Sequence, residues 1–129
     1  MKILILSILI LLPSLGQAKV EDWADTDKVL YNTLLTLQVM DTIQTMNMVE
    51  CRNNKTCINL YEQNPLLGKY PNKKEVLVFK AGVNYALYKY LDNLSYHEDR
   101  RVSLAIAVGI SVLIVGTNAS HGLSFSVRF

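Results

Sequence analysis

The sequence predicts an all-α protein: a signal peptide, then a three-helix membrane-associated bundle with a short strand-like C-terminal tail. Half of the 129 residues are hydrophobic and only 19% are charged, which is apolar for a small soluble protein. Three later stretches have helical periodicity, and the last of them is almost wholly apolar from Val102 to Val115. The length indicates one domain, which we place at residues 19–129.

Residues 1–18 have the layout of a secretory signal peptide. Lys2 supplies a positive start, an apolar run covers residues 3–12, and small residues at Gly16 and Ala18 precede a cleavage site. This run is much shorter than the roughly 20 residues that a transmembrane helix requires. An uncleaved membrane anchor is the alternative.

The first helix of the mature chain is expected at residues 28–50, with Asp25 or Thr26 as its N-cap. One of its faces is unusually polar, because four polar side chains recur there at helical spacing. They are Gln38, Asp41, Gln44 and Thr45. Such a helix enters lipid only if its polar stripe faces protein. The lone Trp23 before it suits either a lipid–water boundary or a small core.

Cys51 and Cys57 close a short ring in the loop expected after this helix. In an exported chain, two cysteines this close indicate a disulfide, and they lack the further ligands of a zinc site. A free pair is the alternative if the loop is cytoplasmic. Basic residues favour that location, namely Arg52, Lys55, Lys69, Lys73 and Lys74. A periplasmic domain docked on the membrane would remove the conflict.

The second helix is expected from an Asn72 cap to about Leu91, with Glu75 completing a capping box. A second capping box, Ser95 with Glu98, should begin the third helix. Small residues four apart on that helix favour close packing in lipid, namely Ala105 with Gly109 and Gly116 with Ser120. A buried core helix of a soluble bundle is the alternative.

The tail from Leu123 to Phe129 alternates apolar and polar residues, as a strand does. A lone strand needs a partner for its backbone. Residues 57–61 or another subunit can supply one.

One set of polar residues is the candidate site. It comprises Asp41, Thr45, Glu62, Asn64, Lys80, Asn84 and Asn118. They can form a buried network that fixes helix packing, a small ion or ligand site, or an acid–base pair of carboxylates. The sequence contains no recognised catalytic motif, metal site or cofactor fingerprint. Lys and Arg are scattered, which argues against nucleic-acid binding.

The order of these motifs resembles a family of small uncharacterised bacterial proteins, often found in prophage regions. The resemblance rests on Trp23, on Asp41 with Gln44 and Thr45, and on the Glu62-x-Asn64-Pro65-x-Leu67-Gly68 stretch. It also includes Asn118 and the strand-like tail. The two cysteines depart from the family pattern. The resemblance implies a helical fold and a membrane location, without an established activity.

We therefore expect a small membrane protein of the bacterial cell envelope, placed in the inner membrane. It should act by binding another envelope protein or a second copy of itself, and it is not expected to be an enzyme. One alternative is a membrane-embedded hydrolase or ion-binding protein that uses Asp41 and Glu62. The other alternative is a soluble helical module of the periplasm.

Overall fold

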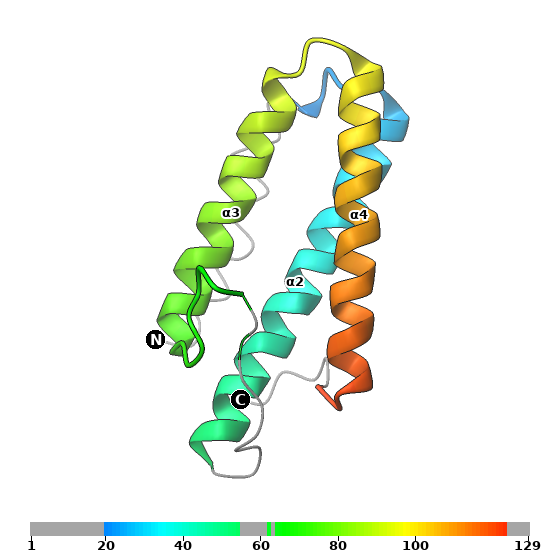
Figure 1. Ribbon diagram of the computed structural model, residues 1–129. Helices are drawn as coiled ribbons and strands as arrows, with labels where there is room; N and C mark the ends of the chain where they lie inside the picture. The colour runs from blue at the N-terminus through cyan, green and yellow to red at the C-terminus, as the bar shows by residue number, and fades with distance from the viewer. Residues whose placement is uncertain (1–19, 55–61, 63, 124–129) are drawn as a thin grey trace.

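The computed structural model describes residues 20–54, 62 and 64–123, and within them it is a bundle of three long helices (Figure 1). The helices are α2 (Asp25–Asn53), α3 (Lys73–Asn93) and α4 (His97–Ser120). No strand occurs in these ranges, so the predicted all-α three-helix class is confirmed. The predicted signal peptide, Cys57 and the tail beyond Leu123 lie outside the described residues.

Helix α2 is the centre of the bundle. Most of the packing joins α2 to α4, less joins α2 to α3, and α3 and α4 touch least. Accordingly, α3 and α4 diverge as they leave the loop that connects them (Figure 1). The hydrophobic core lies near that loop, where Trp23, Leu34, Leu91 and Leu104 are buried together.

Helix α2 begins earlier and ends later than predicted. Its N-cap is Ala24, which makes no side-chain capping bond, so the prediction that Asp25 or Thr26 caps the helix is wrong. Asp25 and Asp27 instead lie within the first turn, where negative charge is stabilised by the helix dipole. At the other end the helix continues to Asn53, so Cys51 lies on its last turn and not in a loop.

Cys51 is disulfide-bonded, and the predicted partner, Cys57, lies outside the described part of the chain. We expect that neither cysteine of the intact protein reacts with a maleimide before reduction, and that both react after it. Mass spectrometry of the labelled protein measures this directly. Labelling of both thiols without reduction would contradict the bond and would favour a cytoplasmic loop.

Helix α3 starts as the sequence predicts. The Asn72 side chain accepts hydrogen bonds from the backbone N–H groups of Lys74 (2.9 Å) and Glu75 (3.0 Å). The Glu75 carboxylate in turn accepts from the N–H of Asn72 at 2.8 Å. The capping box is confirmed, and the helix ends at Asn93, two residues beyond the expected Leu91.

Helix α4 starts differently from the prediction. Its N-cap is Tyr96 and no side chain caps it, so the predicted Ser95–Glu98 capping box is wrong. The backbone N–H of Arg100 binds the Tyr96 carbonyl at 3.2 Å and closes the first turn. Glu98 and Asp99 contribute negative charge to this turn, which the helix dipole favours without a capping side chain.

The outer face of α4 is apolar and uncovered. Val102, Ile106, Ile110 and Leu113 each expose more than half of their area. In the most apolar 18-residue stretch of α4 the mean hydropathy is 2.0, and only 17% of this stretch is buried inside the bundle. Within the described ranges, α4 is the one helix long and apolar enough to cross a membrane.

Candidate functional site

Asp41 joins all three helices. It lies on α2, where one carboxylate oxygen forms an ion pair with Lys80 of α3. The other oxygen accepts a hydrogen bond from the Asn118 amide of α4 at 3.1 Å. The side chains of Asp41 and Lys80 are only 9% and 14% exposed. The pair is therefore a largely desolvated charge contact, and breaking such a contact is costly.

The polar stripe of α2 faces α4. Gln38 donates to the Ser111 hydroxyl at 3.1 Å, and the fully buried Gln44 donates to the Val115 carbonyl at 3.2 Å. Gln44 also reaches the Leu123 carbonyl at 3.3 Å. Thr45 donates back to the Asp41 carbonyl at 2.9 Å, within its own helix. The polar side chains of the stripe thus bond to other groups of the protein.

Three of the seven predicted residues do not join this contact. Glu62 accepts from the backbone N–H of Asn64 at 2.9 Å, and Asn64 accepts from that of Leu66 at 3.0 Å. Both side chains therefore shape their own turn. Asn84 is half-buried one turn beyond Lys80, and its side chain makes no hydrogen bond within the described ranges.

The geometry around Asp41 suits helix packing better than chemistry. Both of its carboxylate oxygens already have partners, and no hydrogen bond or ion pair joins Glu62 to Asp41 or Lys80 among the described residues. The contacts of Asp41 are thus those of a group that holds three helices together. Over the same ranges, no group of three His, Cys, Asp or Glu side chains is placed to hold a metal ion.

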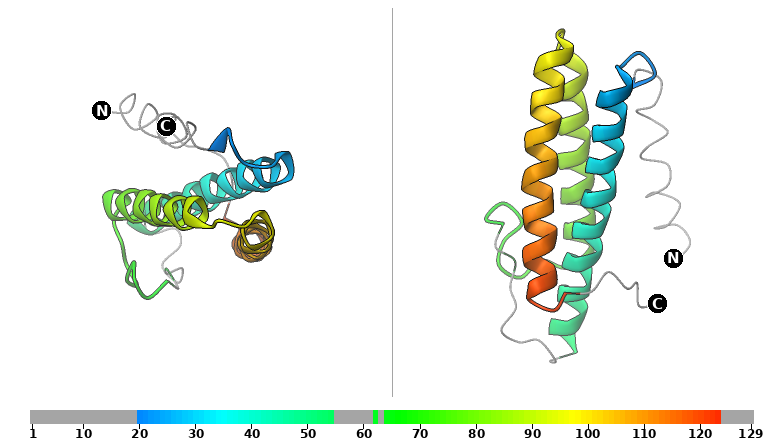
Figure 2. Two further views of the ribbon diagram at one scale, coloured as in Figure 1. Left: turned by 90° about the horizontal axis from the view of Figure 1, so that it is seen from above. Right: turned by 90° about the vertical axis from the view of Figure 1, so that its right-hand side faces the viewer.

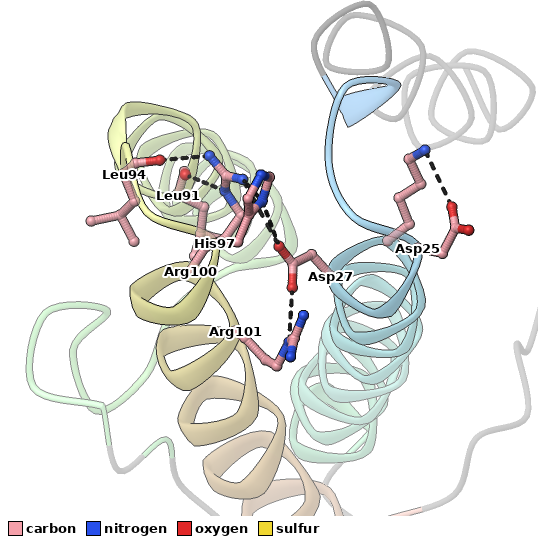
Figure 3. Close-up of polar contacts among 8 residues, drawn as sticks. Asp25, Asp27, Leu91, Leu94, His97, Arg100 and Arg101 are labelled. Carbon is pink, nitrogen blue, oxygen red and sulfur yellow. Dashed lines mark hydrogen bonds and ion pairs between the residues drawn. The ribbon is translucent and has the colours of Figure 1, made fainter.

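A second charged cluster lies at the other end of α4 (Figure 3). Its centre is Asp27, on the first turn of α2, whose side chain is completely buried. One carboxylate oxygen lies 3.4 Å from the Arg101 Nε. The other lies 3.6 Å from the His97 Nδ1 and 3.9 Å from an Arg100 nitrogen, and no hydrogen bond reaches it.

Arg100 ties the parts of this cluster together. Its guanidinium donates to the Leu91 carbonyl at 2.9 Å and to the Leu94 carbonyl at 2.6 Å (Figure 3). Leu91 lies in the last turn of α3, where its carbonyl also accepts from the backbone N–H of the C-cap residue Leu94 at 3.3 Å. The same guanidinium lies 4.6 Å from the centre of the Trp23 ring, a cation–π distance.

Two tyrosines complete the surroundings of Trp23. Tyr31 meets it edge-on at 5.3 Å between ring centroids, and Tyr88 stacks on it at 6.5 Å. Burial raises the pKa of Tyr31, and the neighbouring Tyr88 adds to the effect, so the Tyr31 phenol stays neutral near pH 7. Asp27 is the carboxylate close to the two arginines, at 3.9 Å from Arg100 and 3.4 Å from Arg101.

Sequence reasoning missed the Asp27 cluster. Charged residues in the first turns of helices are ordinarily solvated, and nothing in the local pattern separates Asp27 from the exposed Asp25. Trp23 was the one available signal, since a core position for it was among the sequence alternatives. The structure places Trp23 in the core, only 4% exposed.

The two clusters bracket the apolar part of α4. Arg100 and Arg101 come directly before Val102, and Asn118 follows the apolar stretch. On α2, Asp27 and Asp41 are 14 positions apart, or about 21 Å along the helix axis at 1.5 Å per residue. The clusters therefore fasten α2 to α4 at two levels, with the exposed apolar face between them.

No protein-family model matches the chain, and neither a curated protein nor a solved structure matches it. The class of protein is consequently defined by the fold itself. Over residues 20–54, 62 and 64–123 it is an all-α bundle of three helices, one of which is long and apolar enough to cross a membrane. The resemblance to a family of bacterial and prophage proteins stays a prediction.

Proposed function

We propose that this chain is a membrane protein of the bacterial cell envelope, with α4 crossing the inner membrane, and that it acts by binding another envelope protein. The observation that carries the proposal is the uncovered apolar face of α4 between two polar clusters. In water, so continuous an apolar face is unfavourable and marks an interaction surface. In lipid it needs no cover.

The dimensions agree with a span. Residues 102–117 of α4 cover about 24 Å at 1.5 Å per residue, close to the roughly 30 Å of a hydrocarbon core. Exposed hydroxyls on α2 are also satisfied without water. Thr33 and Thr36 donate to carbonyls four residues earlier, at 2.9 Å in both cases, as polar groups beside lipid require.

A separate surface is available for a protein partner on α3. Val78 and Tyr85 are 73% and 61% exposed, and they lie on one helix face with Gly82, around which there is open space. Tyrosine is enriched where protein interfaces are strongest. We assign this face to the partner and the α4 face to lipid. The family resemblance suggests a prophage origin, in which case the partner is a host envelope protein.

Site-specific photo-crosslinking in native membranes tests this assignment. With benzoylphenylalanine in place of Tyr85, we expect one discrete protein adduct. With the same probe at Leu113 on α4, a matched exposed position, we expect lipid adducts instead. An adduct of twice the protein's mass would identify a second copy as the partner, and absence of any adduct at Tyr85 would contradict the interface.

Carbonate extraction tests the membrane part of the proposal separately. A protein with a spanning helix stays in the membrane pellet at high pH. Release into the supernatant would contradict the span and favour the soluble periplasmic module. The site geometry favours the hydrolase alternative less, because both carboxylate oxygens of Asp41 already have partners within the bundle.

A further inference from the structure

Helices α2 and α4 run in the same direction and lie side by side (Figure 2). Three of the polar contacts between them follow the same order along both helices: Asp27 with Arg101, Gln38 with Ser111, and Gln44 with Val115. Residues 29–44 of α2 are therefore level with residues 102–115 of α4. A membrane that contains this part of α4 must contain this part of α2 as well.

Helix α3 is tied to the same levels. At one end its Leu91 carbonyl accepts from Arg100 at 2.9 Å, and further along Lys80 forms the ion pair with Asp41. Residues 80–88 of α3 therefore lie between the levels of these two contacts. The corresponding parts of the three helices form one layer, called the middle layer below, which comprises residues 29–44, 80–88 and 102–115.

The middle layer is almost free of charge. Asp41 and Lys80 are the only charged residues in its three stretches. They pair with each other, with side chains only 9% and 14% exposed, so the layer as a whole is neutral. Ionisable side chains within a membrane occur in this form, paired with one another and directed towards the interior of a bundle.

The outward-facing side chains of the middle layer are uncharged. On α2 they are valines, threonines and one asparagine, and two of the threonines donate within their own helix. On α3 they are Gly82, Val83, Tyr85 and Ala86. Exposed charged residues return at both ends of the layer, at Lys89 and Arg101 on one side and at Lys74 and Glu75 on the other. A neutral surface between two charged ends suits contact with acyl chains.

The layer is thin for a bilayer. The uncharged surface of α3 extends over residues 76–88, or about 20 Å, compared with roughly 30 Å for a hydrocarbon core. The loop of residues 64–71 lies beside the last turns of α4 and bounds the layer on that side (Figure 2). Lys74 and Lys89 lie near the two ends of the α3 stretch, where long cationic side chains reach outward to the headgroups. Local thinning of the bilayer accommodates the remaining mismatch.

We propose that α2 and α3 are embedded in the membrane beside α4, so that the whole bundle crosses the membrane and acyl chains surround its middle layer. This inference rests on the proposed span of α4, to which the polar contacts hold α2 at matching levels. The composition of α2 hides this role, because its polar stripe is turned inward and bonded. The face of α3 assigned to the partner then lies within the membrane, so the partner must contribute a membrane-spanning segment.

The test uses the full-length protein, purified and reconstituted in phosphatidylcholine vesicles without any partner. A nitroxide is attached to one introduced cysteine at a time, with the native disulfide left unreduced. The variants are Val39→Cys on α2, Val83→Cys on α3 and Ile110→Cys on α4, at side chains that are 39%, 39% and 54% exposed. Electron paramagnetic resonance compares collisions with oxygen, which dissolves among acyl chains, and with a nickel chelate, which stays in water. We expect the same high oxygen-to-nickel ratio at all three positions.

Glu98→Cys, at an exposed position on the first turn of α4, is the aqueous control and should give a ratio several-fold lower. Thr36→Cys and Ala86→Cys, at other exposed positions of α2 and α3, replace any first variant that does not fold. Nickel-dominated collisions on α2 or α3, with oxygen-dominated collisions at Ile110, would overturn the inference and leave α4 as a single span. Nickel-dominated collisions on all three helices would instead refute the span of α4 itself.

Discussion

Replacement of Arg100 by alanine lowers the free energy of unfolding by about 3–5 kcal/mol, the scale for stranding a buried charge. The change leaves Asp27, which is fully buried, with only its long contacts to Arg101 and His97. It also removes the donors to the Leu91 and Leu94 carbonyls and leaves a void against Trp23. All of these contacts are made by the Arg100 side chain, so replacing this one residue has a large combined effect on stability.

Urea unfolding in detergent micelles, followed by Trp23 fluorescence and by helicity, measures this effect. Arg101→Ala is the matched control, because Arg101 is the adjacent arginine on the same carboxylate but its side chain is 48% exposed. Exposed ion pairs contribute about 0–1 kcal/mol, so this variant should be nearly as stable as wild type. Equal losses in the two variants would show that Arg100 has no special role.

Asp41→Ala and Lys80→Met each destabilise the protein by about 3–5 kcal/mol, and the double variant loses much less than the sum of the two. Each single change leaves one charge largely buried without its partner. Removal of both charges restores an uncharged contact between α2 and α3. This non-additivity is the expected signature of a structural ion pair.

The two single variants and the double variant form a double-mutant cycle, which the same unfolding assay measures. Crosslinking at Tyr85 is the functional readout. Asn84→Ala, on the same helix as Lys80, is the control and should change stability by less than about 0.5 kcal/mol. If Asp41→Ala unfolds like wild type but loses the crosslink, Asp41 belongs to a binding site. If it changes neither property, our account of the polar contact is wrong.

The contacts of the polar stripe suggest why α2 is polar on one side. Gln38, Asp41 and Gln44 each bond to a partner on α4, at Ser111, Asn118 and Val115. In lipid, apolar side chains do little to select one register of two helices, whereas interhelical hydrogen bonds do. A slip of one turn along α4 would break all three bonds, so the stripe specifies how the two helices align.

Several features of the fold were predictable because their causes are local. The apolar periodicity of α4 is carried by the residues of that helix alone. The Asn72–Glu75 capping box joins groups three residues apart, so its sequence pattern nearly determines its geometry. The contact between Asp41 and Lys80 was also predictable from the sequence, because few charges interrupt the apolar faces of their helices.

Other features depended on which helices lie side by side. The short oxygen-bearing side chains near the starts of α2 and α4 matched capping patterns, yet neither helix has a side-chain cap. Glu62 belongs to its own turn and not to the Asp41 contact. Asp27 is buried only because the loop after α3 brings Arg100 and Arg101 against the start of α2. Burial of a charge is decided by partners distant in sequence, through desolvation and compensation that no local pattern encodes.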